Sequence, residues 1–319
     1  MPGSNDERQY TQEARAMWDE PLGRRTRSLA AQYGIRPSKR LGQSFLVNER
    51  AAKALAEIVA EGNPPGVVEI GGGLGALSVE LAQRLPRARL TIYELDAQLC
   101  QVLTDLLSPV ARRCWVICSD FLRCSWEDME ADDRWALVGN LPYSMTTPIL
   151  EHIFAGPLRW SHVVVMVQRE FAERMMAGPG SRTYGALSLF AQLHCESIER
   201  VMDLAPGSFW PRPQVASVAL RLKLRRQPPP SVRSPSAFTA VVRAAFGYRR
   251  KTLLRGLATA GIFGAGEEQI RHALEQAGLD PGQRAETVDL EGFARLAEAL
   301  ATAVDSAGET QTGEGEGAD

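Results

Sequence analysis

The 319-residue sequence has no run of about 18 apolar residues, which is roughly the length needed to span a membrane. Its first 20 residues are polar and lack the apolar core of a secretory signal. The five cysteines form no CxxC pair and have no histidine at zinc-ligand spacing. We therefore expect a cytoplasmic protein with reduced thiols, no metal site and no membrane contact.

The formal net charge of the chain is only -2, but the charges are unevenly distributed, and one long stretch has no acidic residue. Between Asp203 and Glu267 the chain has eleven bases and no acid. The near-neutral total hides this basic region, so the net charge does not exclude a nucleic-acid partner. Binding of that kind should weaken as salt displaces phosphate contacts. A second basic cluster precedes the first predicted folded segment: Arg24, Arg25, Arg27, Arg36, Lys39 and Arg40.

The central part of the chain alternates short apolar runs with helical patterns, which indicates an α/β fold with a parallel sheet and crossover helices. After it, a proline-rich segment excludes helix interior and central strand, and only helical spacing follows. The predicted strands are 66–70, 90–95, 115–118, 135–139, 161–168 and 215–224, and the predicted helices are 76–84, 237–260, 267–277 and 290–303. We divide the chain into a partly disordered N-terminal extension (1–38), an α/β domain (39–226), a linker (227–236), a small all-helical domain (237–303) and an acidic disordered tail (304–319).

A glycine-rich turn joins the first strand to the first helix, in VVEIGGGLGALSVELA at residues 67–82. Missing side chains there let a ligand approach the backbone and the helix N-terminus. The G-x-G-x-G spacing from Gly71, with Glu69 two residues before it, favours S-adenosylmethionine over a dinucleotide. Glu94 ends the next strand, where a carboxylate can accept both ribose hydroxyls. Asp120, after the third strand, is either an acceptor for the adenine amine or a loop cap.

The second motif is GNLPYS, which directly follows the fourth strand. An exocyclic amine is a poor nucleophile because its lone pair is delocalised into the purine ring. The Asn140 side-chain oxygen and the Leu141 carbonyl can accept its two N–H groups, which turns the lone pair toward a methyl sulfonium. Tyr143 would stack on the base, and Pro142 would stiffen the loop. The alternative is an ordinary β-turn.

These motifs resemble the KsgA/RsmA family of ribosomal RNA adenine dimethyltransferases, from about residue 39 to about residue 300. The matching blocks keep the family order: KRLGQSFL, VVEIGGGLGALS, YELD, GNLPYSMTTPIL, VQREFAERMMAGPGSRTYGALSLFAQ, APGSFWPRPQVASVALRL and FTAVVRAAFGYRRKTLLRGL. The resemblance implies a Rossmann-like class I methyltransferase sheet of seven strands. It also implies dimethylation, from S-adenosyl-L-methionine, of N6 of two adjacent adenines in a hairpin near the 3′ end of small-subunit (16S) rRNA.

Carried over position by position, the resemblance implies roles for individual residues. Phe209 would sandwich an extruded adenine against Tyr143, since a flipped base needs a stacking partner, or it is a core aromatic. Ser44, where the family usually has Asn or His, and Ala216, in place of a common Asp, depart from the pattern. The implied cofactor contacts are Ser44, Leu46, Gly71, Glu94, Asp120 and Asn140, and the implied catalytic residues are Asn140, Leu141, Tyr143 and Phe209.

The basic stretch supplies the expected RNA contacts. Arg221, Lys223 and Arg225 take alternate positions of the last strand and so share one face. Arg243, Arg249, Arg250 and Lys251 are expected on one amphipathic helix. The expected partner is small-subunit rRNA in a pre-30S particle, with no obligate protein partner and a monomeric enzyme. Two alternatives stay open: a large-subunit rRNA methyltransferase of the antibiotic-resistance type, and a non-catalytic ribosome-assembly factor on the same fold.

Overall fold

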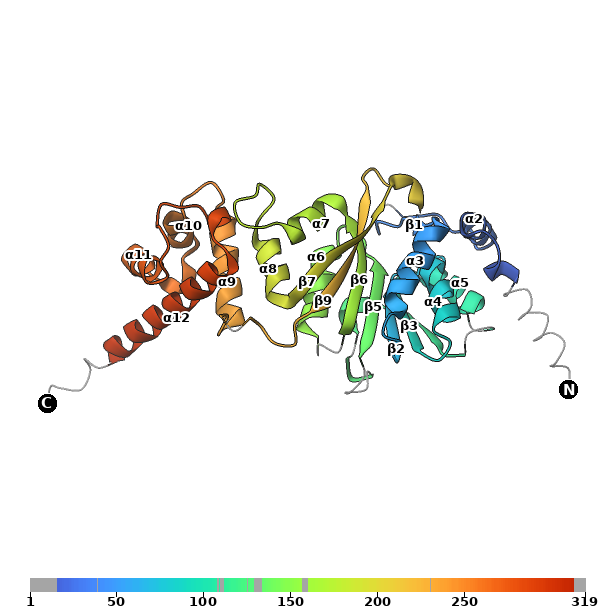
Figure 1. Ribbon diagram of the computed structural model, residues 1–319, viewed down its shortest axis with the longest axis horizontal. Coiled ribbons are helices and arrows are strands. Elements are labelled where there is room, and N and C mark those ends of the chain that lie inside the picture. The colour runs from blue at the N-terminus through green and yellow to red at the C-terminus, as the bar shows by residue number, and fades with distance from the viewer. Residues whose placement is uncertain are drawn as a thin grey trace. The chain divides into compact units, whose positions relative to one another are not determined.

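The computed structural model describes residues 16–38, 40–107, 109, 112–124, 126–128, 134–156, 160–229 and 231–312. The chain divides into two compact units (Figure 1). The first contains the described residues up to Ala172 together with Ser197–Leu224. The second contains Glu173–Glu196 and the described residues from Arg225 onward. No described helix is both long enough and apolar enough to cross a membrane.

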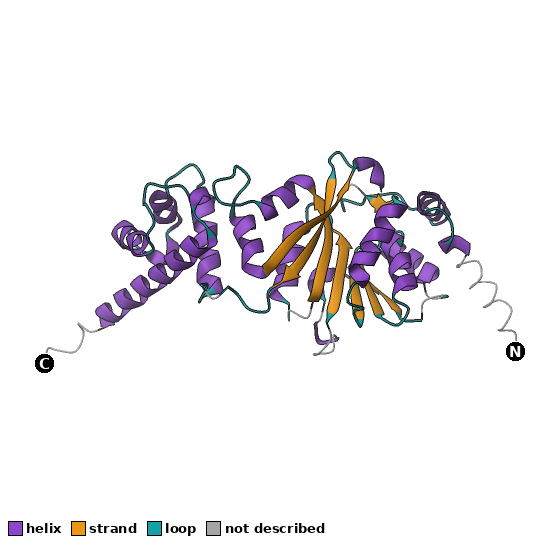
Figure 2. Cartoon of the chain, viewed as in Figure 1, coloured by secondary structure: helices purple, strands orange, loops and turns teal. Residues whose placement is uncertain are grey.

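The first unit is built on a seven-stranded sheet in the order β4-β3-β2-β5-β6-β9-β7, with helices packed around it (Figure 2). The first five strands of that order run parallel, and β9 is antiparallel to β6. This mixed α/β sheet confirms the predicted fold class. The strands are β2 (Gly66–Ile70), β3 (Arg89–Glu94), β4 (Cys114–Cys118), β5 (Trp135–Asn140), β6 (Trp160–Gln168), β7 (Cys195–Leu204) and β9 (Ser217–Leu224).

Apolar spacing explains how the helices cover the sheet. In α3 (Glu49–Ala60), Ala52, Leu55, Ala56 and Val59 recur at helical spacing, and all four are fully buried. All five residues of β2 are buried, as expected for a strand with neighbours on both faces. The other elements that complete this unit are α4 (Ala76–Arg84), α5 (Ala97–Leu107), α6 (Thr146–Ala155), β1 (Phe45–Leu46), β8 (Phe209–Trp210), and the short helices η1 (Phe121–Arg123), η2 (Trp126–Asp128) and η3 (Pro206–Ser208).

The N-terminal extension contains a packed helix, α2 (Leu22–Gln32), that the sequence analysis did not predict. Leu22, Leu29 and Ala30 join the hydrophobic core of the first unit. The Trp18 indole nitrogen donates to the Leu106 carbonyl on α5 (3.1 Å). The extension predicted over 1–38 is therefore packed along α2, which buries an apolar face on the core of the first unit. Residues 1–15 lie outside the described residues.

The second unit has its own helical core and begins earlier than predicted. Residues 173–196 belong to it because Tyr184, Leu189 and Leu193 are buried among the C-terminal helices. The Tyr184 hydroxyl donates to the Val288 carbonyl (2.9 Å). The elements here are α8 (Ala186–His194), α9 (Pro235–Gly247), α10 (Leu253–Ala260), α11 (Glu267–Gln276), α12 (Leu290–Thr312), η4 (Ile262–Gly264) and η5 (Ala285–Thr287), and α7 (Arg169–Met176) crosses from the first unit into this one.

Two predicted boundaries in this unit need correction. The single helix expected over 237–260 is two helices, because α9 ends at Gly247 and the Thr252 hydroxyl caps a new helix by accepting from the Arg255 amide (3.4 Å). The tail expected from residue 304 is helical up to Thr312. No proline interrupts that segment, and its single Gly308 costs only about 1 kcal/mol relative to alanine. Residues 313–319 lie outside the described residues.

Candidate active site

A cavity of about 280 Å³ opens where the strand order of the sheet reverses. β2 lies between β3 and β5, and the carboxyl ends of these parallel strands meet at one edge. Ligands of open α/β sheets bind at this kind of position. Of the nine predicted cofactor and base contacts, eight line the cavity: Ser44, Leu46, Gly71, Glu94, Asp120, Asn140, Leu141 and Tyr143.

The glycine turn after β2 forms one wall of the cavity. Gly71 and Gly73 have positive φ angles of 72° and 57°, which residues with a side chain rarely adopt. The Gly71 amide donates to the Tyr93 carbonyl (2.8 Å), so the turn is fixed to β3. A Cβ atom at Gly73 would lie 2.9 Å from the Phe45 ring. Glycine is therefore required here both by backbone conformation and by space.

Glu94 braces the same turn from the end of β3. One carboxylate oxygen accepts from the Gly73 amide (3.0 Å), and the other accepts from the amides of Leu95 (2.8 Å) and Asp96 (3.0 Å). Burial raises the pKa of Glu94, and these backbone hydrogen bonds partly oppose the rise. A carboxylate has about four acceptor positions, so the side chain can still accept from a ligand hydroxyl. Contact with both ribose hydroxyls stays a prediction.

Asp120 is the loop cap that the sequence offered as one alternative, and its role as an acceptor for the adenine amine stays a prediction. Its carboxylate accepts from the Leu122 amide (3.0 Å) and so begins the short helix η1. The same residue lines the cavity. The neighbouring Phe121 is buried, also lines the cavity, and meets the Tyr93 ring edge to face at 5.5 Å. Its neighbour Leu122 does not line the cavity.

Asn140 is held in one orientation by the loop that carries Ser44. Its amide nitrogen donates to the Ser44 main-chain carbonyl (2.8 Å). Because the nitrogen is engaged there, the amide oxygen is the atom left to accept from a substrate. The Ser44 hydroxyl donates to the Pro211 carbonyl (2.8 Å), which ties this loop to the segment after β8. Ser44 therefore acts in this structure as a support for Asn140.

The turn after Asn140 is fixed by hydrogen bonds of the Pro142 backbone and of the Tyr143 side chain. The Pro142 carbonyl accepts from the Met145 amide (2.9 Å) and the Thr146 hydroxyl (3.1 Å). The Tyr143 hydroxyl is 3.1 Å from that of Ser217, a buried residue at the start of β9. The tyrosine ring is thus anchored at the cavity wall. Ser217 was not predicted, because no local sequence pattern connects it to Tyr143.

Phe209 does not line the described cavity. It lies in the short strand β8, which pairs with β1 and places Phe209 opposite Leu46. Both side chains are buried in the hydrophobic core. This position agrees with the alternative of a core aromatic, since only a few per cent of the side chain is exposed. Stacking of an extruded base on Phe209 stays a prediction.

Gln43 is a support that the sequence analysis missed. Its amide oxygen accepts from the Ser38 amide (2.8 Å), and its amide nitrogen donates to the Asp96 carboxylate (2.8 Å). These contacts hold Gln43 against Ser38 and against Asp96, just after the end of β3. Leu95, next to Glu94, lines the cavity with 58% of its surface exposed. Gln43 lies inside the block KRLGQSFL, but nothing in that block identified its partner.

Acidic side chains predominate among the charged residues of the cavity wall. Glu69, Glu94 and Asp120 line it, against a single base, Arg40. One Glu69 carboxylate oxygen is buried without a hydrogen-bond partner among the described residues, and burial raises the pKa of Glu69 to about 7. A ligand with a sulfonium and an ammonium group suits this wall electrostatically. The residues present therefore fit S-adenosylmethionine.

The buried Glu69 carboxyl predicts a pH dependence of stability. Its pKa in the folded protein is above its unfolded value, so its contribution is complete below about pH 4 and is lost as pH rises through 7. Between pH 5 and pH 8 the unfolding free energy of the ligand-free protein should fall. In Glu69→Gln this fall should be about 2 kcal/mol smaller than in the unmodified protein. Denaturant titrations at both pH values measure this. Parallel pH profiles for the two proteins would contradict the assignment.

The predicted RNA contacts near the end of the sheet are partly paired within the protein. Arg221 makes an ion pair with Glu61 (2.6 Å). Arg225 follows β9, belongs to the second unit and donates to the Gln192 carbonyl (3.3 Å). The basic stretch therefore is compensated in part, because acids from other segments reach it. Lys223 is exposed, and a role for it toward RNA stays a prediction.

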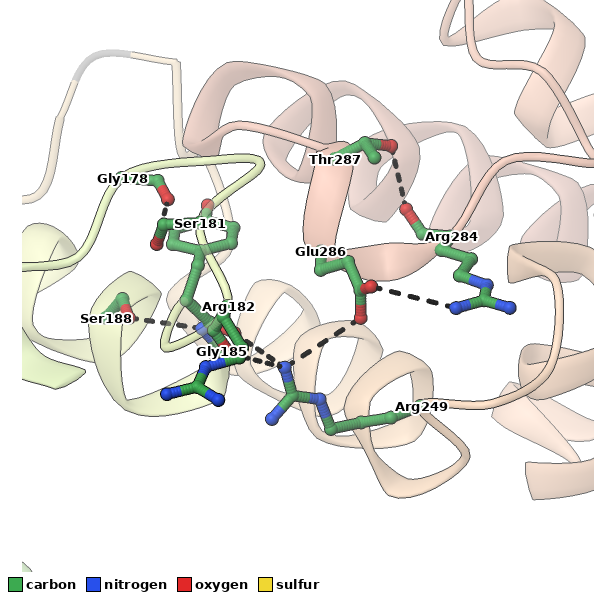
Figure 3. Close-up of polar contacts among 10 residues, drawn as sticks. Gly178, Ser181, Arg182, Gly185, Ser188, Arg249, Arg284, Glu286 and Thr287 are labelled. Atoms are coloured by element: carbon green, nitrogen blue, oxygen red, sulfur yellow. Dashed lines mark hydrogen bonds and ion pairs between the residues drawn. The ribbon is translucent and has the colours of Figure 1, made fainter.

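Arg249 makes polar contacts within the second unit (Figure 3). Its guanidinium donates to the carbonyls of Arg182 (3.3 Å) and Tyr184 (3.2 Å) and lies 3.8 Å from Glu286. It thus joins the loop before α8 to the turn after α9. The expectation of one basic helix is wrong, because residues 248–252 form this turn. The other members of the group, Arg243, Arg250 and Lys251, are exposed.

The fold and the cavity define a class of protein: a class I methyltransferase that uses S-adenosyl-L-methionine. The strand order is that of an open α/β sheet with a reversal point. One cavity at this point is lined by the glycine turn, by the acidic residue that ends β3 and by the Asn-Leu-Pro-Tyr turn after β5. The model of the ribosomal RNA adenine dimethylase family matches residues 35–302. The chain belongs to this family.

Comparison with known proteins supports membership of this family. The ribosomal RNA small subunit methyltransferase A of Anoxybacillus flavithermus is 38% identical over 282 residues, which cover 86% of this chain and 94% of that protein. Its counterpart in Geobacter metallireducens is 38% identical over 270 residues, 84% of this chain and 96% of that protein. The crystal structure of the 23S rRNA methyltransferase ErmE has a TM-score of 0.58 at 27% identity and covers 81% of this chain and 99% of its own. A Plasmodium falciparum dimethyladenosine transferase shares the fold, with a TM-score of 0.65 at 21% identity over 81% of this chain and 98% of that one.

Proposed function

We propose that this enzyme dimethylates N6 of two adjacent adenines in a hairpin near the 3′ end of small-subunit (16S) rRNA. The observation that carries the proposal is the orientation of Asn140, whose amide nitrogen is bound to the Ser44 carbonyl and whose oxygen is left for a substrate. The names of the relatives from Anoxybacillus and Geobacter support the small subunit as the substrate.

The residues of the Asn-Leu-Pro-Tyr turn position the reacting nitrogen. The Asn140 oxygen and the Leu141 carbonyl accept the two N–H groups of the adenine amine, which favours a tetrahedral nitrogen with a directed lone pair. Tyr143, anchored at Ser217, stacks on the base. Bound S-adenosylmethionine supplies an electrophilic methyl group at its sulfonium. The methyl–sulfur bond would break as the N–C bond forms, and the amine proton would pass to solvent afterwards, so no general base is needed before attack.

The substrate particle, the cellular compartment and the oligomeric state belong to the same proposal. The substrate is rRNA within a pre-30S particle, and the enzyme acts in the cytoplasm as a monomer without an obligate protein partner. Membership of the rRNA adenine dimethylase family supports an RNA substrate. The exposed bases of the second unit, Arg243, Arg250 and Lys251, are suitable phosphate contacts.

A second candidate is methylation of large-subunit rRNA. The fold likeness to the 23S rRNA methyltransferase ErmE favours it, at a lower identity than that of the small-subunit relatives. Purified small and large subunits lacking these modifications, each incubated with methyl-labelled S-adenosylmethionine, separate the candidates. We expect label in the small subunit, approaching four methyl groups per particle. Label confined to the large subunit would support the second candidate, and binding to particles without any transfer would support a non-catalytic assembly factor.

A further inference from the structure

The helix α2 and the loop after it carry bases without acids. Between Glu20 and Glu49 the sequence has six bases and no acidic residue. α2 turns its apolar side chains into the core, so Arg24 and Arg27, three positions apart on the opposite face, are exposed. Arg36, just after the helix, is exposed as well. We call Arg24, Arg27 and Arg36 the α2 arginines.

The α2 arginines differ from the bases that the protein uses for its own structure. Arg25 on the same helix is buried, and its guanidinium donates to the Trp18 carbonyl (3.0 Å). Arg221 and Arg249 make ion pairs with acids. None of the α2 arginines makes an ion pair or a side-chain hydrogen bond with a residue that the structure describes. Among the described residues, no acid neutralises their charge.

The α2 arginines are held on a fixed path that leads to the active-site cavity. The Tyr33 hydroxyl, at the end of α2, donates to the Asp105 carboxylate on α5 (2.9 Å). Further along the chain, Gln43 contacts Ser38 and Asp96. Arg40, three residues before Gln43, is exposed and lines the cavity. α2 and the cavity rim at Arg40 thus belong to one compact unit.

We propose that the α2 arginines bind phosphates of the RNA that flanks the target adenines. This rests on the proposed function. An adenine that enters the cavity brings its neighbouring backbone across the rim, where exposed guanidinium groups meet consecutive phosphates. The family model begins to match only at residue 35, so α2 precedes the part of the chain that the family pattern describes. The α2 arginines Arg24 and Arg27 therefore lie outside the matched range, and Arg36 lies at its start.

The test uses two full-length variants that lose the same charge at different places. Arg24, Arg27 and Arg36 are changed to Gln in the test variant. In the control variant, Arg87, Arg112 and Arg113 are changed to Gln; these are exposed and precede β3 and β4, at the amino ends of the strands, opposite the cavity edge. The affinity for unmethylated small subunits is measured between about 50 and 200 mM salt, the range over which phosphate contacts weaken most visibly. Cofactor affinity and thermal unfolding are measured in parallel.

We expect the test variant to bind small subunits at least about 10-fold more weakly at the lower salt, with a salt slope reduced by about two to three. The control variant should keep the affinity and slope of the unmodified enzyme, and cofactor affinity should be unchanged in both. A third variant with Lys at positions 24, 27 and 36 keeps the charge and should bind within about threefold of the unmodified enzyme.

Three results would overturn the proposal: an unchanged affinity and slope in the test variant, an equal loss in the control, or no recovery with lysine. The proposal would also be overturned if the test variant lost affinity for an acidic protein and kept its affinity for RNA. Failure of the proposed function looks different, because the unmodified enzyme itself would then transfer no methyl group to small subunits.

Discussion

Replacement of Asn140 by alanine is expected to lower methyl transfer to small-subunit rRNA by about 1000-fold. The change removes the oxygen that accepts from the adenine amine in the transition state, and a single such group is worth roughly 100- to 1000-fold in rate. It also releases the Ser44 carbonyl, which receives the Asn140 amide in the structure. Cofactor affinity should change by less than about tenfold, since this side chain is one of several predicted cofactor contacts. Single-turnover transfer rates and calorimetric cofactor binding measure the two effects.

Asn48→Ala is the matched control for Asn140→Ala. Asn48 caps α3 by accepting from the Ala51 amide (3.1 Å) and does not line the cavity. Its loss should cost about 1 kcal/mol of stability and leave the transfer rate near that of the unmodified enzyme. Asn140→Asp adds a sharper comparison, because it keeps an acceptor and loses the donor to Ser44. Full activity in Asn140→Ala would refute the catalytic role of Asn140.

Gly73→Ala is expected to weaken cofactor binding by at least about 100-fold and to cost about 2–3 kcal/mol of stability. The new Cβ would lie 2.9 Å from the buried Phe45 ring, so the turn or the ring must move. A side chain also strains the positive φ at this position. Movement of the Gly73 amide disturbs its hydrogen bond to Glu94. Calorimetric titration with S-adenosylmethionine and denaturant unfolding measure the result.

Gly62→Ala separates backbone strain from the steric effect. Gly62 also has a positive φ, 77°, but a Cβ there meets no atom within 4 Å. It lies in the turn before β2, at the edge of the sheet opposite the cavity. This control should lose about 1 kcal/mol of stability and keep its cofactor affinity. Equal cofactor affinities for Gly73→Ala and Gly62→Ala would show that the glycine turn does not shape the cofactor site.

Much of the first unit could be predicted because its signals are local. The buried strand 66–70 and the helix 76–84 agree with the structure to the residue, since an apolar run and a glycine turn mark their limits. α2 was missed because its apolar face is narrow and interrupted by arginines, one of which, Arg25, is itself buried. Residues 173–196 were assigned to the wrong unit because the burial of Tyr184 depends on helices about 100 residues further on.

The candidate site shows the same division between local and long-range information. The sequence could name Asn140 and Glu94, because each ends a strand beside a glycine turn. It could not show that Ser44 and Gln43 fix the loop over these residues, since their partners Asn140 and Asp96 are far away in the chain. It also could not distinguish a stacking aromatic from a core aromatic at Phe209. That choice depends on the pairing of β8 with β1.

The account is tested most directly by mapping where the methyl groups go. Unmethylated small subunits are incubated with labelled S-adenosylmethionine and the enzyme, and the rRNA is digested and analysed by mass spectrometry. We predict N6,N6-dimethyladenosine at two adjacent positions in a hairpin near the 3′ end, and its absence with Asn140→Ala. Label at another nucleotide, in large-subunit rRNA alone or in a free small molecule would contradict the account.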